Sequence, residues 1–369
     1  MTFHFGSYYK KFINFALLLS LSLPVFSQID SSSTRTRTTT KVADGVYMIR
    51  HKDSPDGFPQ GNTTVIIGER EVFVVDACYL PSSAKEDIAQ IRQWANKPVR
   101  YLFNTHWHND HVNGNGTYAE AFPDITIIAH FETSKQIKGY APGIFERFPT
   151  RGAAFQQIID SGKDPNGRVL NADEIKAYKE ALAGLAPVSE EFKKIKLRMP
   201  NMTFDSELTL DIGNREIQIK YLGRGNTAGD AIVYLPKEKI LIAGDLLDSP
   251  VPYLGSGYPS QHAKTLRKMA QMDFEILIPG HGNVLKGKTY LNLVADFIQT
   301  VVDEVSKAIF QIGGGPRNLE AVRQTVHKTI DFTEWKKKIV GDNKEDGNFF
   351  DGFSVQGVVT AAYAESWGR

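Results

Sequence analysis

Three histidines and one aspartate fall within six consecutive positions of this chain, directly after the apolar segment 99–104. They are His106, His108, Asp110 and His111, and the whole chain contains only nine histidines. Imidazole and carboxylate groups suit zinc, and a tight loop can direct alternate side chains at two neighbouring ions. The cluster therefore predicts a metal site in a loop that follows a strand.

Around this cluster, short apolar segments alternate with segments of helical periodicity. Apolar runs and period-two patterns predict strands at 46–49, 64–67, 72–75, 99–104, 125–129, 208–212, 217–221, 231–235, 240–243 and 276–278. Helical spacing predicts helices at 83–94, 176–185, 190–197, 262–272, 290–310, 319–328 and 355–367, the first with a capping box at Ser83 and Glu86. This order indicates an α/β protein with a helical insertion at 131–200 and a C-terminal helical extension at 287–369.

The N-terminus has the three parts of a secretory signal peptide. Lys10 and Lys11 precede the uncharged run 12–23, and Pro24 and the small-residue site 25–27 follow it. An uncleaved membrane anchor is the alternative, but the run is short for the roughly 20 residues that a spanning helix needs. We expect cleavage of residues 1–27, a flexible leader at 28–41, and a periplasmic or secreted protein without stable membrane insertion.

Charge and cysteine content narrow the possible partners. Lys and Arg total 43 and Asp and Glu total 42, so the chain lacks the basic excess that binds nucleic acid. We therefore expect a small-molecule substrate, and the oligomeric state stays open. Cys78 is the only cysteine and lies in the apolar run 74–80, which favours a buried inert thiol over a nucleophile.

The cluster matches the signature His-x-His-x-Asp-His, and in this the chain resembles the metallo-β-lactamase superfamily. Three further motifs follow in the family's order, at 225–230, 244–245 and 279–282. The resemblance covers 42–286 and implies an αββα sandwich with metals at one edge between the sheets. It also implies a set of metal ligands: His106, His108, Asp110, His111, Asn226, Asp245 and His281.

Asn226 departs from the family pattern, which has a histidine at this place. An amide oxygen is a neutral and weaker ligand for zinc than an imidazole nitrogen. Either Asn226 ligates through its oxygen or a water and the first site is weak, or only the second site fills. We expect Zn²⁺ to bind tightly at the second site, formed by Asp110, His111 and His281 with Asp245 available, and a labile ion at the first.

These parts indicate a hydrolase that uses metal-bound hydroxide, because a metal lowers the pKa of bound water towards about 7. Asp110 could orient that water and pass its proton to the leaving group, or it could act only as a ligand. An exported enzyme for a cyclic amide, ester or lactone is favoured, with β-lactams leading. Asp245 resembles instead the bridging carboxylate of glyoxalase II and lactonases. A thioester or phosphoester hydrolase and a metal-poor binding protein are the alternatives.

Four residues outside these motifs have simpler interpretations. His130, His262 and His327 lie outside any ligand spacing, so structural roles are expected. Phe58, in the loop 51–61, could cover an apolar substrate or pack on its own loop.

Overall fold

The computed structural model describes residues 36–140, 147–164, 167, 169–315 and 317–367. The expected signal peptide at 1–27 lies outside the described residues. Among the described residues, no helix is both long and apolar enough to cross a membrane.

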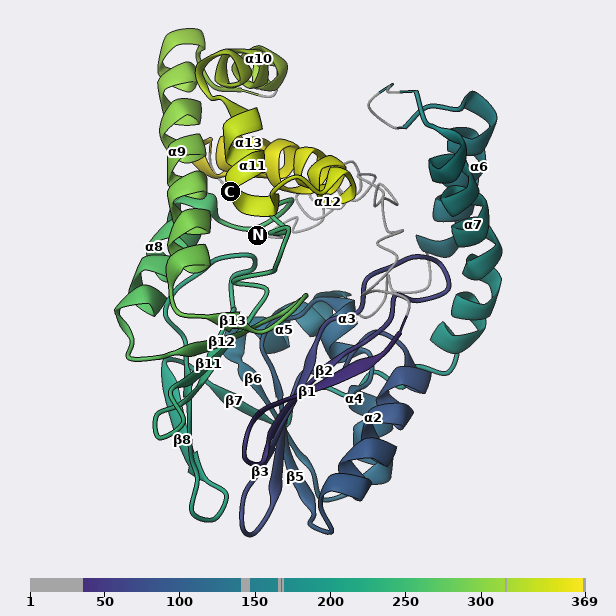
Figure 1. Ribbon diagram of the computed structural model, residues 1–369, viewed down its shortest axis with the longest axis vertical. Helices are drawn as coiled ribbons and strands as arrows, with labels where there is room; N and C mark the ends of the chain where they lie inside the picture. Colours follow the sequence, from purple (N-terminus) through teal and green to yellow (C-terminus); the bar gives the residue numbers. More distant parts are fainter. Residues whose placement is uncertain (1–35, 141–146, 165–166, 168, 316, 368–369) are drawn as a thin grey trace, which may run out of the picture.

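Two β-sheets form the centre of the molecule (Figure 1). The first has the order β1 to β7, with strands Thr38–Ala43, Val46–Arg50, Thr63–Ile67, Val72–Val75, Val99–Asn104, Thr126–His130 and Met202–Phe204. The second runs from β13 to β8, and in chain order its strands are Glu207–Asp211, Glu216–Lys220, Ile232–Leu235, Ile240–Gly244, Ile276–Pro279 and Leu285–Lys286. Strands β4 and β5 are parallel, as are β11 and β12, so their carboxyl ends lie at one edge of each sheet.

Helices cover both outer faces of the sheet pair. In chain order α2 to α7 are Pro81–Trp94, Asn109–Val112, Asn115–Ala121, Phe131–Tyr140, Arg147–Ser161 and Ala172–Phe192. The rest are α8 Pro259–Gln271, α9 Thr289–Ile312, α10 Leu319–Thr329, α11 Phe332–Val340, α12 Lys344–Phe349, the π-helix η2 Phe350–Val355 and α13 Gln356–Ser366. The four layers form the expected αββα sandwich.

The layers follow from the alternation of side chains along each strand. On β4, Phe73 and Val75 face the core between the sheets, whereas Val72 and Val74 face the core under α2. On the other side, Leu241 of β11 packs into a large core with α8, α9 and α13, while Ile242 joins the inter-sheet core. Both faces of these strands are buried, which explains their continuous apolar sequences.

Three expectations about elements are wrong. Residues 38–41, expected in the flexible leader, belong to β1, because this Thr-rich segment pairs with β2 at the sheet edge. Helix α2 begins at Pro81 after Leu80, without a side-chain cap, so Ser83 and Glu86 form no capping box. The helices expected at 176–185 and 190–197 are one helix, α7, with Pro187 inside it, and residues 193–197 are not helical.

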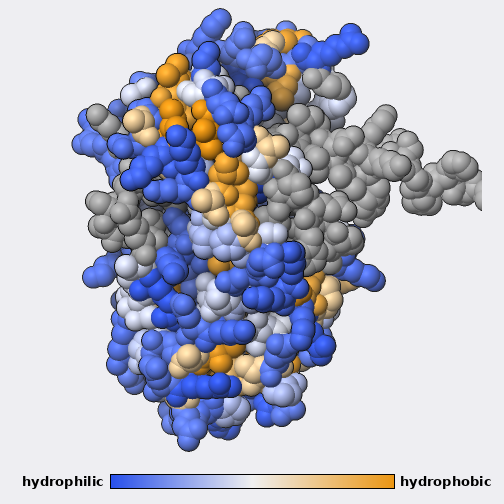
Figure 2. Space-filling view, turned by 90° about the vertical axis from the view of Figure 1, so that its right-hand side faces the viewer, coloured by the Kyte–Doolittle hydropathy of each residue, from blue (hydrophilic) through white to orange (hydrophobic). Residues whose placement is uncertain are grey.

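Helices α6 and α7 form a hairpin that stands beside the sandwich (Figure 1). Its small core contains Phe155, Tyr178 and Leu185, whereas Ile159 and Leu182 stay partly exposed. Figure 2 shows the face that carries this hairpin, with a stripe of apolar atoms in its upper part.

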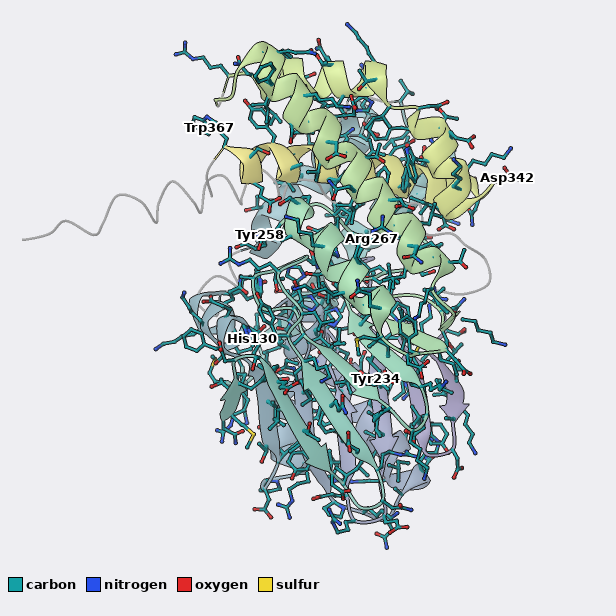
Figure 3. The ribbon with its side chains drawn as sticks, turned by 90° about the vertical axis from the view of Figure 1, so that its left-hand side faces the viewer. His130, Tyr234, Tyr258, Arg267, Asp342 and Trp367 are labelled. Carbon is teal, nitrogen blue, oxygen red and sulfur yellow. The ribbon has the colours of Figure 1, made fainter. Side chains whose placement is uncertain are left out.

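Helices α8 and α9 lie along one another over the second sheet, as Figure 3 shows. Arg267 of α8 forms an ion pair with Asp296 of α9. The helices that follow pack back on this pair, and Glu365 of α13 accepts hydrogen bonds from the backbone and hydroxyl of Ser260 at 2.7 and 2.9 Å. The C-terminal helices therefore share one core with the sandwich.

Candidate metal centre

Loops at the carboxyl ends of three strands bring six of the candidate residues together. Strand β5 leads into the loop and short helix α3 that carry His106, His108, Asp110 and His111. Strand β11 ends directly before Asp245, and β12 ends two residues before His281. Parallel strands present their carboxyl ends at one edge, which is where ligands gather in α/β folds.

The ligand atoms of these residues lie close to one another. His106 Nε2 is 3.2 Å from Asp245 Oδ2, and His108 Nδ1 is 3.8 Å from the same oxygen. His111 Nε2 is 3.1 Å from Asp245 Oδ1 and 3.4 Å from Asp110 Oδ2. His281 Nε2 lies 3.0 Å from Asp110 Oδ2. Two groups, His106–His111–Asp245 and Asp110–His111–His281, have ligand atoms within 4.8 Å of one another.

Unpartnered atoms at this point show that the residues fit a cation. His106 Nε2 and Asp245 Oδ1 are buried and make no hydrogen bond of acceptable geometry among the described residues. Buried polar atoms without partners are rare and indicate a missing water or ion. Nitrogen and carboxylate donors that face one another at these distances form a donor set typical of a zinc centre.

Asp76 holds two of the imidazoles in the required tautomer, and the sequence reasoning missed it. His111 Nδ1 donates to Asp76 Oδ2 at 2.9 Å. The Thr105 hydroxyl donates to the same oxygen at 2.8 Å and accepts from His106 Nδ1 at 3.0 Å. In the neutral form of each ring, the lone pair is therefore on Nε2, where it can bind an ion. The available signal was an aspartate directly after the apolar strand β4.

Charges around the centre shift several pKa values in the metal-free protein. Burial opposes protonation of His111, but Asp245, Asp110 and Asp76 raise its pKa well above the usual value. Burial lowers the pKa of His281 as well, but Asp245 and Asp110 outweigh burial and raise that pKa to about 9. Burial raises the pKa of Asp245, but His111, His106 and His281 outweigh it and hold that pKa well below normal. The carboxylates thus stabilise positive charge in the centre, on the protonated imidazoles of the metal-free protein.

Asn226 lies in the loop before β10 and is 1% exposed. Its Oδ1 accepts a hydrogen bond from Ser256 Oγ at 3.4 Å, and its Nδ2 has no partner among the described residues. Gly257 packs against this loop, because a Cβ there would lie 2.6 Å from the Asn226 carbonyl oxygen. The loop 249–258 therefore fixes Asn226 from one side.

Asp248 is a second carboxylate that the motifs did not indicate. Its ligand atoms lie within 4.8 Å of those of Asp245 and His281. Burial, and then the negative charge of Asp245, raise the pKa of Asp248 well above its usual value.

The loop between β2 and β3 holds the histidines from the other side. The Gly61 Cα lies against the His111 ring, since a Cβ there would be 2.4 Å from its Cε1. The Asn62 backbone donates to the Gly280 carbonyl at 2.7 Å, and its side chain donates to the carbonyls of Pro279 and Gly282, each at 3.0 Å. These contacts fix the position of the His111 ring relative to the loop that carries His281.

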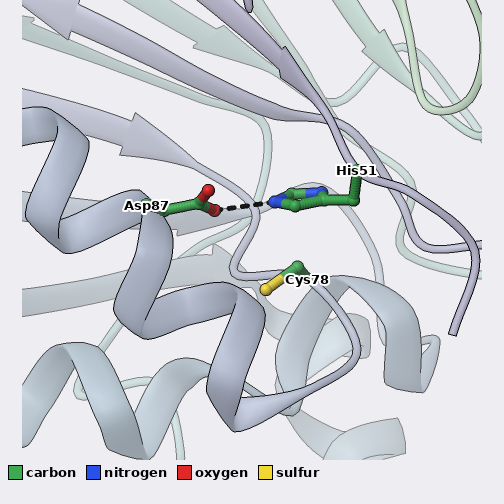
Figure 4. A group of neighbouring side chains, drawn as sticks. All are labelled: His51, Cys78 and Asp87. Atoms are coloured by element: carbon green, nitrogen blue, oxygen red, sulfur yellow. Dashed lines mark hydrogen bonds and ion pairs between the residues drawn. The ribbon is translucent and has the colours of Figure 1, made fainter. Parts of the chain in front are cut away.

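A buried pair anchors this loop (Figure 4). His51 Nδ1 contacts the Gly61 carbonyl at 2.7 Å, and His51 Nε2 contacts Asp87 Oδ2 at 2.8 Å. Arg37 donates to the other Asp87 oxygen at 2.9 Å. Cys78 lies beside the pair and is buried, as expected, and burial raises its thiol pKa well above normal. Because both His51 nitrogens are engaged, this group braces the loop.

Aromatic side chains flank the partly exposed His108. Its ring centroid is 4.8 Å from that of Trp107 and 6.2 Å from that of Tyr253. Trp107 in turn contacts Tyr140, and Tyr253 contacts Phe353 of η2 at 5.8 Å. Phe58 is not part of this group, because it stacks on Tyr79 at 4.7 Å under the Arg151 guanidinium.

The three histidines that were expected to be structural make such contacts. His130, labelled in Figure 3, stacks on Tyr221 at 4.1 Å and contacts the Asp205 carbonyl at 2.8 Å. His262 contacts the Leu246 carbonyl at 2.9 Å, and His327 packs on Phe332.

Comparison with known proteins shows the family to which the chain belongs. A family model described as the metallo-beta-lactamase superfamily matches residues 56–281. A linear primary-alkylsulfatase from Pseudomonas sp. is 24% identical over 246 residues, which are 63% of this chain and 44% of that protein. A type 2 metallo-beta-lactamase from Elizabethkingia meningoseptica is 26% identical over 102 residues, 26% of this chain and 41% of that protein. The matches thus span less than half the length of these relatives.

Among solved structures, a metallo-beta-lactamase from Pontibacter korlensis has the same fold. Its TM-score is 0.51 at 17% identity, with 72% of this chain and 99% of that chain covered.

Proposed function

Because the chain belongs to the metallo-β-lactamase superfamily, we propose that it is an exported, metal-dependent hydrolase of small-molecule esters or amides. The observation that carries the proposal is the convergence of four histidines and two aspartates at one sheet edge. Two atoms of this cluster, His106 Nε2 and Asp245 Oδ1, are buried without a hydrogen bond among the described residues, which adds to the support.

Two groups of residues hold the ions in this proposal. Asp110, His111 and His281 would hold one Zn²⁺ tightly, and the ligand atoms of Asp245 lie within 4.8 Å of those of His111 and His281. His106, His108 and Asn226 would hold a second, labile ion, because Asn226 offers only a neutral amide oxygen. Bound Zn²⁺ supplies Lewis acidity, which lowers the pKa of water and polarises the scissile bond.

The residues of the chain supply orientation and proton transfer. Asp76 and Thr105 keep the His111 and His106 rings in place through their Nδ1 atoms. Asp110 is 5% exposed and, beyond acting as a ligand, would orient the attacking water, accept its proton and pass that proton to the leaving group. Trp107 and Tyr253 beside His108 contact an apolar arm of the substrate.

Two substrate classes are favoured. A cyclic amide or lactone of the β-lactam type is the first, since an exported enzyme meets such compounds. A sulfate ester with an alkyl or aryl arm is the second, because the alkylsulfatase matches 63% of the chain and the aromatic pair suits an apolar arm.

The test is a hydrolysis panel run on the full chain together with metal analysis. We expect turnover of a β-lactam, a lactone or an alkyl sulfate, and loss of turnover and of tightly bound metal in His281→Ala. A thioester and a phosphodiester complete the panel. If the metal-loaded protein hydrolyses none of these compounds, a binding protein on the same fold replaces the enzyme.

Export is tested separately by the intact mass of the protein that the producing cell releases. A mature chain that begins near Gln28 supports export. A released chain that still carries residues 1–27 contradicts signal cleavage.

A further inference from the structure

Asp248 stands where its carboxylate can reach the ion held by His281. It follows Asp245 by three residues in the loop after β11, and the ligand atoms of Asp245, Asp248 and His281 lie within 4.8 Å of one another. The motifs at 106–111, 225–230, 244–245 and 279–282 do not include this residue.

The Asp248 carboxylate is held by one oxygen and free at the other. Its Oδ2 accepts a hydrogen bond from the Tyr253 backbone at 3.3 Å. Its Oδ1 is buried and has no hydrogen-bond partner in the part of the chain that the structure describes, and the residue is 3% exposed. A buried carboxylate oxygen without a partner is unfavourable in general unless a cation or a proton compensates it.

Backbone hydrogen bonds fix the position of Asp248 relative to the loop that carries His281. Leu247 donates to the Gly244 carbonyl at 3.2 Å and accepts from Gly280 at 3.1 Å. Ser249 donates to the His281 carbonyl at 3.1 Å. The loops that carry Asp248 and His281 are therefore joined on both sides of Asp248.

We propose that Asp248 is a metal ligand, which binds through Oδ1 the same ion as His281. The inference rests on the proposed metal centre and extends its ligand set. One half of the centre has a neutral amide at Asn226 where an imidazole is expected, and the other half gains a carboxylate. An added anionic oxygen strengthens binding of a divalent ion and suits harder ions such as Mn²⁺ as well as Zn²⁺.

The first test compares metal affinities of the full chain without any substrate. Asp248→Asn keeps the size of the side chain and its acceptor for the Tyr253 backbone, but it removes the negative charge. The matched control is Glu238→Gln, since Glu238 pairs with Arg215 at 3.0 Å in the turn at the far end of β11. Zn²⁺ and Mn²⁺ binding is measured by competition with a chromophoric chelator, and stoichiometry by native mass spectrometry.

We expect Asp248→Asn to weaken one bound ion at least about tenfold, with a larger loss for Mn²⁺ and no loss in Glu238→Gln. Equal affinities in the wild type and Asp248→Asn would overturn the proposal.

A second measurement uses the wild-type protein, so it can be made even if Asp248→Asn does not fold. In zinc-loaded crystals of the wild type, the anomalous signal should place an ion about 2.0–2.2 Å from Asp248 Oδ1. An ion bound by His281 with no Asp248 oxygen in its coordination sphere would contradict the assignment. Neither measurement uses hydrolysis, so failure of this inference and failure of the proposed function are separate results.

Discussion

In the proposed centre, Asn226 is the residue that sets the strength of the first half. Its amide is buried, and Oδ1, which accepts a hydrogen bond from Ser256, keeps one lone pair for an ion, whereas Nδ2 only donates hydrogen bonds and is not a metal ligand. An imidazole at the same position would supply a lone pair on nitrogen.

We therefore expect Asn226→His to raise the metal stoichiometry from about one towards two, and to raise the hydrolytic rate if the first ion limits it. Inductively coupled plasma mass spectrometry after dialysis measures the stoichiometry. A wild-type protein that already retains two ions would show that the amide suffices. A rise in stoichiometry with a fall in rate would instead give Asn226 a role in orienting substrate or water.

Proton release on metal binding is expected from the charged imidazoles. An imidazole binds an ion only in its neutral form, and the pKa of His281 in the metal-free protein is about 9. Below that pH the ion must displace a proton, so apparent affinity should rise with pH from about 6 to about 9, by up to tenfold per unit for each proton released. Calorimetry in buffers of different ionisation enthalpy measures the release. An affinity that is flat between pH 7 and 8 would contradict the pKa shift.

At this scale, the motif residues could be predicted and their supporting carboxylates could not. The spacing of His106, His108, Asp110 and His111 alone indicates a set of metal ligands. Asp76 and Asp248 are single acids after apolar runs, and only the three-dimensional arrangement shows that both face the same centre.

The loop between β2 and β3 acts as one element, since the His51–Asp87 pair anchors it and its end touches the centre. Arg151 of α6 adds a buried ion pair with Asp56 at 2.5 Å. The Gly184 Cα packs on the Pro55 carbonyl, where a Cβ would lie 1.8 Å from the oxygen. Helices α6 and α7 therefore hold the loop against the centre.

Gly61→Ala should disturb the centre, because its Cβ would overlap the His111 ring. We expect tightly bound metal to fall at least about tenfold in affinity, since a ligand that moves by a fraction of an ångström no longer has the required geometry. Chelator competition measures this. The control is Gly139→Ala in α5, where a Cβ meets nothing within 4 Å. Unchanged metal affinity in Gly61→Ala would show that the loop can move back without cost.

The elements that follow simple periodicity were predictable, including the hairpin from β8 to β9. Its turn has Gly213 and Asn214 at positive φ, which the residue types indicate. Strand β1 was missed because Thr-rich polar segments also occur in leaders, and pairing with β2 decides the outcome. Helix α7 was expected as two helices, at 176–185 and 190–197, but it continues through Pro187, because tertiary packing of Tyr178, Leu185 and Phe192 outweighs the local cost of proline.

In the molecule as a whole, the C-terminal helices support the centre as well as the core. Ser354 of η2 donates to the Pro252 carbonyl at 2.6 Å, and Phe353 packs on Tyr253 beside His108. Gly357 packs on the backbone of Gly255, with 2.7 Å from its Cβ position to the Gly255 Cα. The family model ends at residue 281, so these helices are a further part of this chain that shapes its site.

A shared core predicts that damage to α9 destabilises the whole molecule. Phe297 is fully buried and contacts the rings of Trp335 and Phe350 at 5.4 and 5.2 Å. Phe297→Ala should therefore lower the free energy of unfolding by about 3–5 kcal/mol. Phe310→Ala on the same helix is the control, because Phe310 is 92% exposed and its loss should change stability by less than about 0.5 kcal/mol.

Urea unfolding followed by far-ultraviolet circular dichroism and by metal release measures both variants. If α9 and the sandwich unfold together, Phe297→Ala shifts both signals to the same lower urea concentration. Metal release at the wild-type midpoint, after an earlier loss of helical signal, would mean that the C-terminal helices unfold on their own. In that case the contacts of η2 with Tyr253 and Pro252 would not be needed to keep the metal bound.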